Sequence, residues 1–416
     1  MQSTQVGIRD PSTPARMDRR VTSIAGVVAA GGLILSAGLG IRQTFGLYLA
    51  PIAQEHVVTV ASLSLAIALQ NLVWGLGQPV AGACTDRFGP APVVAVGACL
   101  YALGLGTVAF QPAFLAVVAG FGIMVGLGQA AMTFAVVIAS VSRAANAAQR
   151  ATAVAVVAAA GSLGQVALVP LAQSTIDLAG VRTSLVVMAL VALAVAPFAL
   201  ILQRKTPFAG EIGVKSATGS AIRLALRDPS FLLLTAGFFA CGFQLAFMGV
   251  HLPGYLLACH VSANVGAAAL ALIGFFNIIG SFAFGRAAGR WPPQYLLAFL
   301  YAVRASATAV YVATPVSAAT TLAFAIVMGL TWLGTVPLTN AVIARLHGLP
   351  NLGALFGVCF VGHQLGGFLG VLSGGLAVQM TGSYTPVWIA TIAIGFAAAL
   401  LNVPIQSRSH VATVVA

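Results

Sequence analysis

Residues 59–89 read TVASLSLAIALQNLVWGLGQPVAGACTDRFG. The run 59–83 is almost free of charge, and a helix of about 20 residues is enough to cross the roughly 30 Å hydrocarbon layer of a membrane. The run ends in Gly82-Ala-Cys-Thr-Asp86-Arg87-Phe88-Gly89, where an acid and a base stand side by side. This stretch therefore predicts a transmembrane helix followed by a short charged loop at the membrane surface.

The same pattern extends over the whole chain, because 60% of its 416 residues are hydrophobic and only 6% are charged. Soluble domains carry about 25% charged residues, so lipid must be the solvent for most of this surface. We predict an all-α membrane protein with twelve transmembrane helices. Their approximate ranges are 21–48, 59–83, 91–110, 114–140, 151–172, 183–202, 230–257, 263–284, 295–313, 318–343, 353–377 and 385–404.

The basic residues predict the orientation, since Lys and Arg in short loops stay on the cytoplasmic side. With both termini cytoplasmic, all of the 19 Lys and Arg residues except Arg42, Arg182 and Arg304 fall in cytoplasmic tails and loops. The formal net charge of +12 is thus a topology signal. We therefore expect the protein to contact membrane lipids and not to bind nucleic acid, and we expect it in the cell inner (plasma) membrane.

A polar and basic stretch between the sixth and seventh spans divides the chain into two halves. The predicted organisation is a cytoplasmic tail 1–20, a six-helix bundle 21–202, a central loop 203–229, a second six-helix bundle 230–404 and a tail 405–416. The halves resemble one another as parallel repeats do. At an offset of 202 or 203, Gly40, Phe45, Gly77, Gly82 and Arg87 meet Gly242, Phe247, Gly280, Gly285 and Arg290.

The loop after the second span resembles the signature GxxxD(R/K)xG of the major facilitator superfamily. The signature positions are held by Gly82, Asp86, Arg87 and Gly89, and a degenerate copy is formed by Gly285, Gly289 and Arg290. The resemblance covers the whole chain and implies the major facilitator fold of two pseudo-symmetric six-helix bundles. It also implies that this loop is a conformational latch between the halves. The usual basic residues after Gly89 are absent, which predicts a weaker latch.

Arg42 is the candidate for binding an anion. It lies late in the first predicted span, whereas all seven Asp and Glu residues fall in tails, loops or loop edges. A charge at that depth costs at least about 2.5–3.5 kcal/mol unless it is compensated. Arg binds a carboxylate through two parallel hydrogen bonds, so a substrate carboxylate is the expected counterion. The alternative is a side chain that reaches the outer headgroups or bonds to backbone carbonyls.

Further polar side chains in the spans favour a polar central path. Each is either a substrate contact or an interhelical hydrogen bond. The substrate-binding candidates besides Arg42 are Gln70, Asn71, Gln129, Gln244, Asn277, Trp332 and His363, and the same set of spans carries Gln165, Asn340, Gln364 and Trp74.

His363 is the histidine placed deepest in a span, and histidine can change its charge near neutral pH. It is therefore the candidate for proton coupling, with a structural hydrogen bond as the alternative. His251, near Pro253, is a candidate gate residue at the outer end of the seventh span. For Arg304, in the middle of the ninth span, we expect a structural role.

Within the superfamily, residues 40–51 and 68–75 resemble the branch of monocarboxylate porters and oxalate:formate exchangers. That branch carries carboxylates and often uses basic residues in the first, eighth and eleventh spans. Arg42 matches the first of these, whereas Asn277 and His363 occupy the eighth and eleventh spans here. The departure favours a substrate with a single carboxylate.

The sequence thus predicts a secondary active transporter that moves a small organic anion, a monocarboxylate, by alternating access as a monomer. Coupling to protons or by exchange both remain open. The alternatives are a multidrug or neutral-solute efflux transporter of the same fold, for which a buried acid is expected, and a non-transporting receptor, for which a sizeable soluble domain is expected. An enzyme is not predicted, because HExxH, GxSxG and phosphate-loop motifs are absent. The five cysteines stand singly, so no metal and no cofactor are expected.

Overall fold

The computed structural model describes residues 23–55, 58–202, 215–348 and 351–406, and every regular element among them is a helix. The predicted tail 1–20, most of the predicted tail 405–416 and part of the central loop 203–229 lie outside the described residues.

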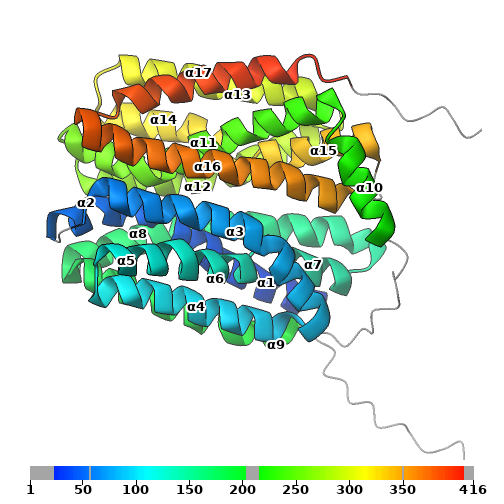
Figure 1. The fold of residues 1–416 in the computed structure, drawn as a ribbon, viewed down its shortest axis with the longest axis horizontal. Coiled ribbons are helices and arrows are strands. Elements are labelled where there is room, and N and C mark those ends of the chain that lie inside the picture. The colour runs from blue at the N-terminus through cyan, green and yellow to red at the C-terminus, as the bar shows by residue number, and fades with distance from the viewer. Residues whose placement is uncertain (1–22, 56–57, 203–214, 349–350, 407–416) are drawn as a thin grey trace, which may run out of the picture.

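The first group of helices fills the lower half of Figure 1. Its elements are α1 (Ile24–Arg42), α2 (Phe45–Glu55), α3 (Val60–Phe88), α4 (Pro90–Phe110), α5 (Phe114–Val117), the π-helix η1 (Val118–Met124), α6 (Val125–Met132), α7 (Phe134–Ala144), α8 (Ala147–Ala194), the short 3₁₀ helix η2 (Ala196–Phe198) and α9 (Ala199–Leu202).

The second group fills the upper half of Figure 1. Its elements are α10 (Lys215–Ala225), α11 (Pro229–Ala258), α12 (Ala263–Ala287), α13 (Pro293–Ala313), α14 (Ala318–Thr331), α15 (Thr335–His347), α16 (Leu352–Thr381) and α17 (Thr385–Asn402). The two groups meet chiefly where α3 packs on α16 and α8 packs on α12.

Within the described residues, 11 helical segments are long and apolar enough to cross a membrane. One of them, Ala148–Leu202, is 55 residues long, and in its middle Gly180 has the non-helical angles φ 81° and ψ 169°. The Ser184 hydroxyl donates to the carbonyl of Ala172 at 3.0 Å, although a straight helix would hold these residues about 18 Å apart. The chain therefore doubles back at Gly180. The structure thus has 11 membrane-length segments among the described residues, one of which contains two arms, and the count of twelve spans stays a prediction.

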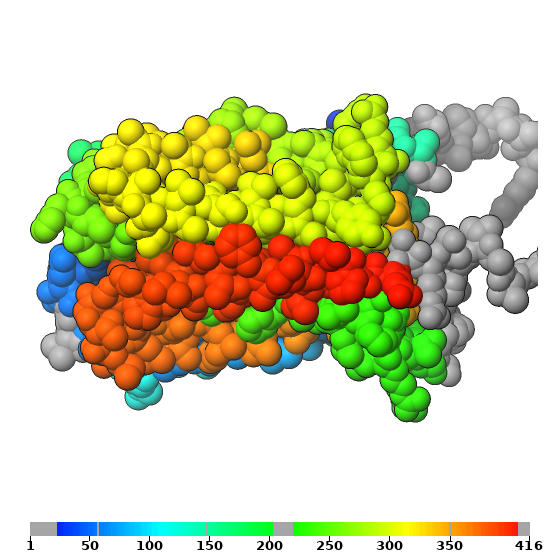
Figure 2. All heavy atoms as spheres, turned by 90° about the horizontal axis from the view of Figure 1, so that it is seen from above, coloured from blue at the N-terminus to red at the C-terminus, as the bar shows by residue number. Residues whose placement is uncertain are grey.

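The outer surface of the helices is apolar. α17 runs along the face shown in Figure 2, with α13 and α14 beside it. Large hydrophobic side chains of these helices are exposed, among them Phe299 of α13 at 60% and Leu400 of α17 at 72%. Soluble proteins rarely expose so many large hydrophobic side chains, so this surface fits contact with lipid tails.

Glycines allow the helices to approach closely inside each group. A Cβ atom on Gly40 of α1 would lie 2.6 Å from the carbonyl oxygen of Gly164 in α8. In the second group, a Cβ atom on Gly242 of α11 would meet the carbonyl of His363 in α16. Gly40 and Gly242 are 202 residues apart, so the same kind of crossing occurs at the repeat spacing. Small residues of this kind are typical of helix contacts in membranes, where the backbones come close.

Candidate functional site

Three membrane-length segments are interrupted near their middle. α1 and α2 are separated by Gln43 and Thr44, α6 and α7 by Thr133, and α14 and α15 by residues 332–334. An interruption frees backbone groups that lipid cannot satisfy, so such breaks persist only where protein or a cavity surrounds them. Interrupted helices are also where transporters of known structure bind their substrates.

The break at Thr133 is held by α3. The Thr133 hydroxyl accepts hydrogen bonds from Trp74 Nε1 at 2.9 Å and from Gln78 Nε2 at 2.8 Å. The amide oxygen of Gln78 in turn accepts from the backbone N–H of Ala135 at 2.9 Å, in the first turn of α7. Polar groups of α3 thus replace the hydrogen bonds that the helix loses here.

The break at residues 332–334 is held by two side chains of the second group. Asn277 of α12 accepts from the N–H of Leu333 at 2.9 Å, and its amide nitrogen donates to Ser162 of α8 at 2.8 Å. Arg304 of α13 donates to the carbonyls of Thr331 and Trp332, at the C-terminal end of α14. A cation suits this place because helix C-termini carry partial negative charge.

Arg42 ends α1 at the first break, and its side chain is half-buried. Nη2 donates to Asn71 Oδ1 at 2.6 Å and Nη1 to Gln43 Oε1 at 3.3 Å, while Nε is buried without an acceptor. The guanidinium lies over the Trp74 ring, with 5.3 Å between its carbon and the ring centroid. Only two of its five N–H groups are therefore used.

No carboxylate of the described residues pairs with Arg42. Among the described residues, Asp86 pairs with Arg143 and Asp228 pairs with His347. Arg42 is consequently a half-buried cation with unused donors and neutral neighbours. Such a group can hold an anion through charge and through directed hydrogen bonds.

Both groups of helices reach the surroundings of Arg42. Gln43 Nε2 donates to Gln165 Oε1 at 2.9 Å, and Gln165 Nε2 donates to the carbonyl of Leu270 in α12 at 2.7 Å. From α16, Gln364 Nε2 donates to the carbonyl of Asn71 at 3.3 Å. The structure thus brings Arg42, Asn71 and Gln165 of the predicted set together. It adds Gln43, which the sequence analysis missed although it follows Arg42 directly.

Four rings in mutual contact are here called the aromatic cluster. Trp74 lies under Arg42, Phe134 and Phe360 pack on Trp74, and His363 packs on Phe360. The Trp74 centroid is 5.3 Å from that of Phe360 and 6.2 Å from that of Phe134. His363 is nearly parallel to Phe360 at 5.9 Å, and its Nδ1 is 2.9 Å from Gln364 Oε1. Because Trp74 follows Asn71 by one turn of α3, the cluster lies on the side of Arg42 that faces Asp86.

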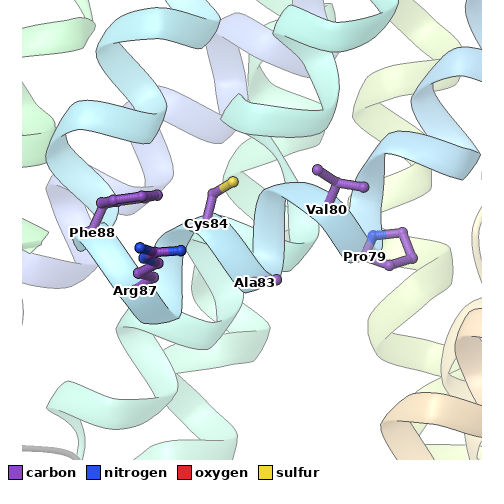
Figure 3. A pocket seen from close by; sticks show the side chains of 6 residues that line it. All are labelled: Pro79, Val80, Ala83, Cys84, Arg87 and Phe88. Atoms are coloured by element: carbon purple, nitrogen blue, oxygen red, sulfur yellow. The ribbon is translucent and has the colours of Figure 1, made fainter.

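The packing of α3 on α16 ends at this cluster. About one and two turns beyond Gly75, toward Asp86, Pro79 and Ala83 of α3 are exposed. On α16, Cβ atoms on Gly357 and Gly353 would find nothing within 4 Å. A groove of about 410 Å³ opens along this part of α3 (Figure 3) and is lined by Pro79, Val80, Ala83, Cys84, Arg87 and Phe88.

At the opposite end the two groups are in tight contact. A Cβ atom on Gly46 of α2 would be 2.6 Å from the carbonyl oxygen of Gly249 in α11. One on Gly375 of α16 would be 3.0 Å from Cα of Ala61 in α3. The two groups are therefore in contact at the end that carries Gly46. The end that carries Asp86, where the positions named on α3 and α16 are exposed, is here called the open end.

Other predicted site residues bind neighbouring helices. Gln70 donates to Gln129 at 3.0 Å, and both side chains are fully buried between α3 and α6. Gln244 donates to the carbonyl of Thr391 at 3.0 Å and accepts from Arg304 at 3.2 Å. The substrate-binding role of these three glutamines, and of Asn277 and Trp332, stays a prediction.

The predicted latch lies at the open end. Asp86 pairs with Arg143 at 3.0 Å, within the first group of helices, and Arg87 lies over the Phe88 ring at 5.1 Å. Gly89 has φ 85° and ψ 166°, a conformation that is essentially limited to glycine. Gly82 leaves 3.8 Å between an added Cβ atom and Ala135, so α3 and α7 lie close here.

Membrane-length helices in two groups, with breaks around a half-buried guanidinium, define a multi-pass membrane transport protein. The chain belongs to the Major Facilitator Superfamily, whose family model matches residues 28–371.

Named relatives agree with this family. The chain is 25% identical over 382 residues to the uncharacterized MFS-type transporter YcxA of Bacillus subtilis, covering 88% of this chain and 91% of the relative. It is 25% identical over 353 residues to monocarboxylate transporter 13 of Bos taurus, covering 84% and 82%. Among solved structures, a bacterial homolog of the human lysosomal transporter Spinster, inward-facing and unoccupied, matches with a TM-score of 0.67 at 15% identity, over 93% of this chain and 95% of that one.

Proposed function

We propose that this protein is a secondary active transporter that moves a small organic anion, a monocarboxylate, across the membrane by alternating access. The observation that carries the proposal is Arg42, a half-buried cation with three unused N–H groups and no carboxylate partner among the described residues. Holding such a cation in the membrane is costly unless an anion compensates it. A substrate carboxylate supplies the missing charge and accepts the free hydrogen bonds.

The number of fixed cations favours one carboxylate over two. Within the described residues Arg304 is the other guanidinium deep in the spans, and it is fully buried against Gln244, Thr331 and Trp332. It is therefore committed to the α14 break and does not face Arg42. Monocarboxylate transporter 13 among the relatives supports the same substrate class.

The proposed topology has twelve spans, because the two arms of Ala148–Leu202 on either side of Gly180 each have the length of one crossing. Both termini then lie in the cytoplasm of a cell whose inner (plasma) membrane holds the protein. In this proposed orientation the end with Asp86 and Arg87 is cytoplasmic, and the exposed positions of α3 and α16 face the cytoplasm. Transport requires a second conformation in which the cytoplasmic end closes and the Gly46 end opens.

Coupling to protons is assigned to His363 or to the carboxyl group of the substrate. His363 is half-buried beside the Arg42 site, and one ring nitrogen faces Gln364. A proton on its other nitrogen would change the charge of the site by one unit, which alters the affinity for an anion. Only such a difference in affinity can couple a ligand to the conformational exchange.

Thermal stabilisation of the purified full chain tests the proposal, because a ligand that binds the folded state raises its melting temperature. We expect monocarboxylates such as lactate or benzoate to raise it, and neutral sugars and cationic drugs to leave it unchanged. The shift is expected to vanish in Arg42→Gln. It is expected to persist in the matched control Arg182→Gln, which removes an exposed guanidinium over Phe110. If neutral or cationic solutes stabilise the protein and no acid does, the proposal of an anionic substrate is refuted.

A further inference from the structure

The aromatic cluster offers rings, and few polar groups, to whatever binds Arg42. Phe134 and Phe360 are half-buried, so each residue remains partly accessible. The indole N–H of Trp74 already donates to Thr133, which leaves only the apolar surface of its ring for a ligand. A molecule that reaches Arg42 meets the Trp74 indole, and the rings of Phe134, Phe360 and His363 adjoin that indole through successive ring contacts.

Resting on the proposed anion transport, we propose that the substrate is an aromatic monocarboxylate, with its carboxylate on Arg42 and its planar ring in the aromatic cluster. The rings stand in two nearly perpendicular orientations. Trp74 and Phe134 are 24° apart, Phe360 and His363 are 4° apart, and Trp74 is at 87° to Phe360. A planar ring can stack on one pair and meet the other edge to face, and these are the two preferred arrangements of aromatic pairs.

Beyond the N–H groups of Arg42, which the carboxylate would take, polar substituents on the substrate would find few partners here. The amide of Asn71 is used by Arg42 and the carbonyl of Ile67, and that of Gln364 by His363 and the carbonyl of Asn71. A hydroxy acid would give up water for its hydroxyl group with little in return, and an unpaired polar group is costly. The surroundings of Arg42 therefore favour an unsubstituted ring over a short hydroxy acid.

Geometry also relates the carboxylate to the ring. The guanidinium carbon of Arg42 is 5.3 Å from the Trp74 centroid, and the Phe360 centroid is again 5.3 Å from Trp74. The Trp74 indole therefore contacts both the Arg42 guanidinium and the Phe360 ring. A benzene ring attached directly, or through one carbon, to a carboxylate on Arg42 would therefore lie within reach of the Trp74 indole.

The test compares benzoate with cyclohexanecarboxylate, which has the same charge and ring size but no π system, in titrations of the purified full chain. Each favourable ring contact contributes about two- to tenfold in affinity. We expect benzoate to bind at least about tenfold more tightly than cyclohexanecarboxylate, and lactate to bind more weakly than both. The preference should fall toward one in Phe360→Leu and in Phe134→Leu. It should persist in Phe299→Leu, which changes a phenylalanine on the exposed surface of α13.

The outcomes separate this inference from the proposed function. If all three acids bind equally and Arg42→Gln abolishes their binding, anion transport stands and the aromatic substrate is refuted. An unchanged preference in both cluster variants also refutes it. If no acid binds, both proposals fall. Using two cluster variants keeps the test decisive when one of them does not fold.

Discussion

Replacing Gly40 by alanine tests whether the close crossing of α1 and α8 positions Arg42. The new Cβ atom would lie 2.6 Å from the carbonyl oxygen of Gly164, whereas ordinary contacts begin at 3.4 Å. The two helices must therefore move apart by about 0.8 Å at this point. Because the Cβ atom is fixed to its backbone and the atoms that it meets belong to the backbone of Gly164, no side-chain rotation can relieve the contact.

Two effects of opposite sign set the stability of Gly40→Ala. Overpacking costs about 1–3 kcal/mol, and replacing glycine by alanine inside a helix recovers about 0.5–1 kcal/mol. We expect a net loss of roughly 0.5–2 kcal/mol and a lower melting temperature. The control is Gly106→Ala in α4, where an added Cβ atom meets nothing within 4 Å. That variant should melt at the same temperature as the parent protein or higher.

Binding should respond together with stability, because Arg42 is two residues from Gly40. Its hydrogen bond to Asn71 spans 2.6 Å, and N–H···O bonds weaken beyond about 3.2 Å. A displacement of 0.8 Å is sufficient to break it. Titration with a monocarboxylate should show weaker binding by Gly40→Ala and unchanged binding by Gly106→Ala. Parental stability and affinity in Gly40→Ala would refute the argument that this crossing positions the guanidinium.

Three further changes probe other parts of the structure through melting temperatures in detergent. Asp86→Asn should cost less than about 1 kcal/mol, since its ion pair is exposed, and a loss that does not shrink at high salt would contradict this. Gly180→Ala should cost about 1–3 kcal/mol from backbone strain alone, because an added Cβ atom meets nothing within 4 Å, and an unchanged protein would disprove the reversal there. Arg304→Met leaves the carbonyls of Thr331 and Trp332 without donors, so a loss of roughly 2–6 kcal/mol is expected, and a neutral result would show that the break needs no cation.

The membrane-spanning segments were predictable from the sequence because lipid demands long apolar runs. Membership of the family, predicted from Gly82–Gly89 and the span pattern, is confirmed by the family match over residues 28–371. The helix breaks were not predicted. Thr133 and residues 332–334 contain no proline, whereas Pro51, Pro79 and Pro253 lie inside unbroken helices. Tertiary hydrogen bonds from α3, α12 and α13 stabilise the breaks. Local sequence contributes only to the break at residues 332–334, because Pro337 has no N–H to bond to the carbonyl of Leu333.

The candidate site was only partly predictable for the same reason. The rarity of charge singled out Arg42, and a polar residue within a span singled out Asn71. The partners Gln43 and Thr133 carry no signal that separates them from other polar residues. Phe134 and Phe360 carry none either, because aromatic residues in a membrane span face lipid or core equally well. Only the packing of α3, α7 and α16 shows that these two rings meet beside Arg42.

Uptake into proteoliposomes tests the central claim most directly. The measurement compares the initial rate of uptake of a radiolabelled monocarboxylate, with and without a pH gradient, by the parent protein, Arg42→Gln and Arg182→Gln. We predict saturable uptake by the parent protein. Its initial rate should fall at least about tenfold in Arg42→Gln and stay unchanged in Arg182→Gln. Equal uptake by all three proteins, or no uptake of any carboxylate alongside transport of a neutral or cationic solute, would contradict it.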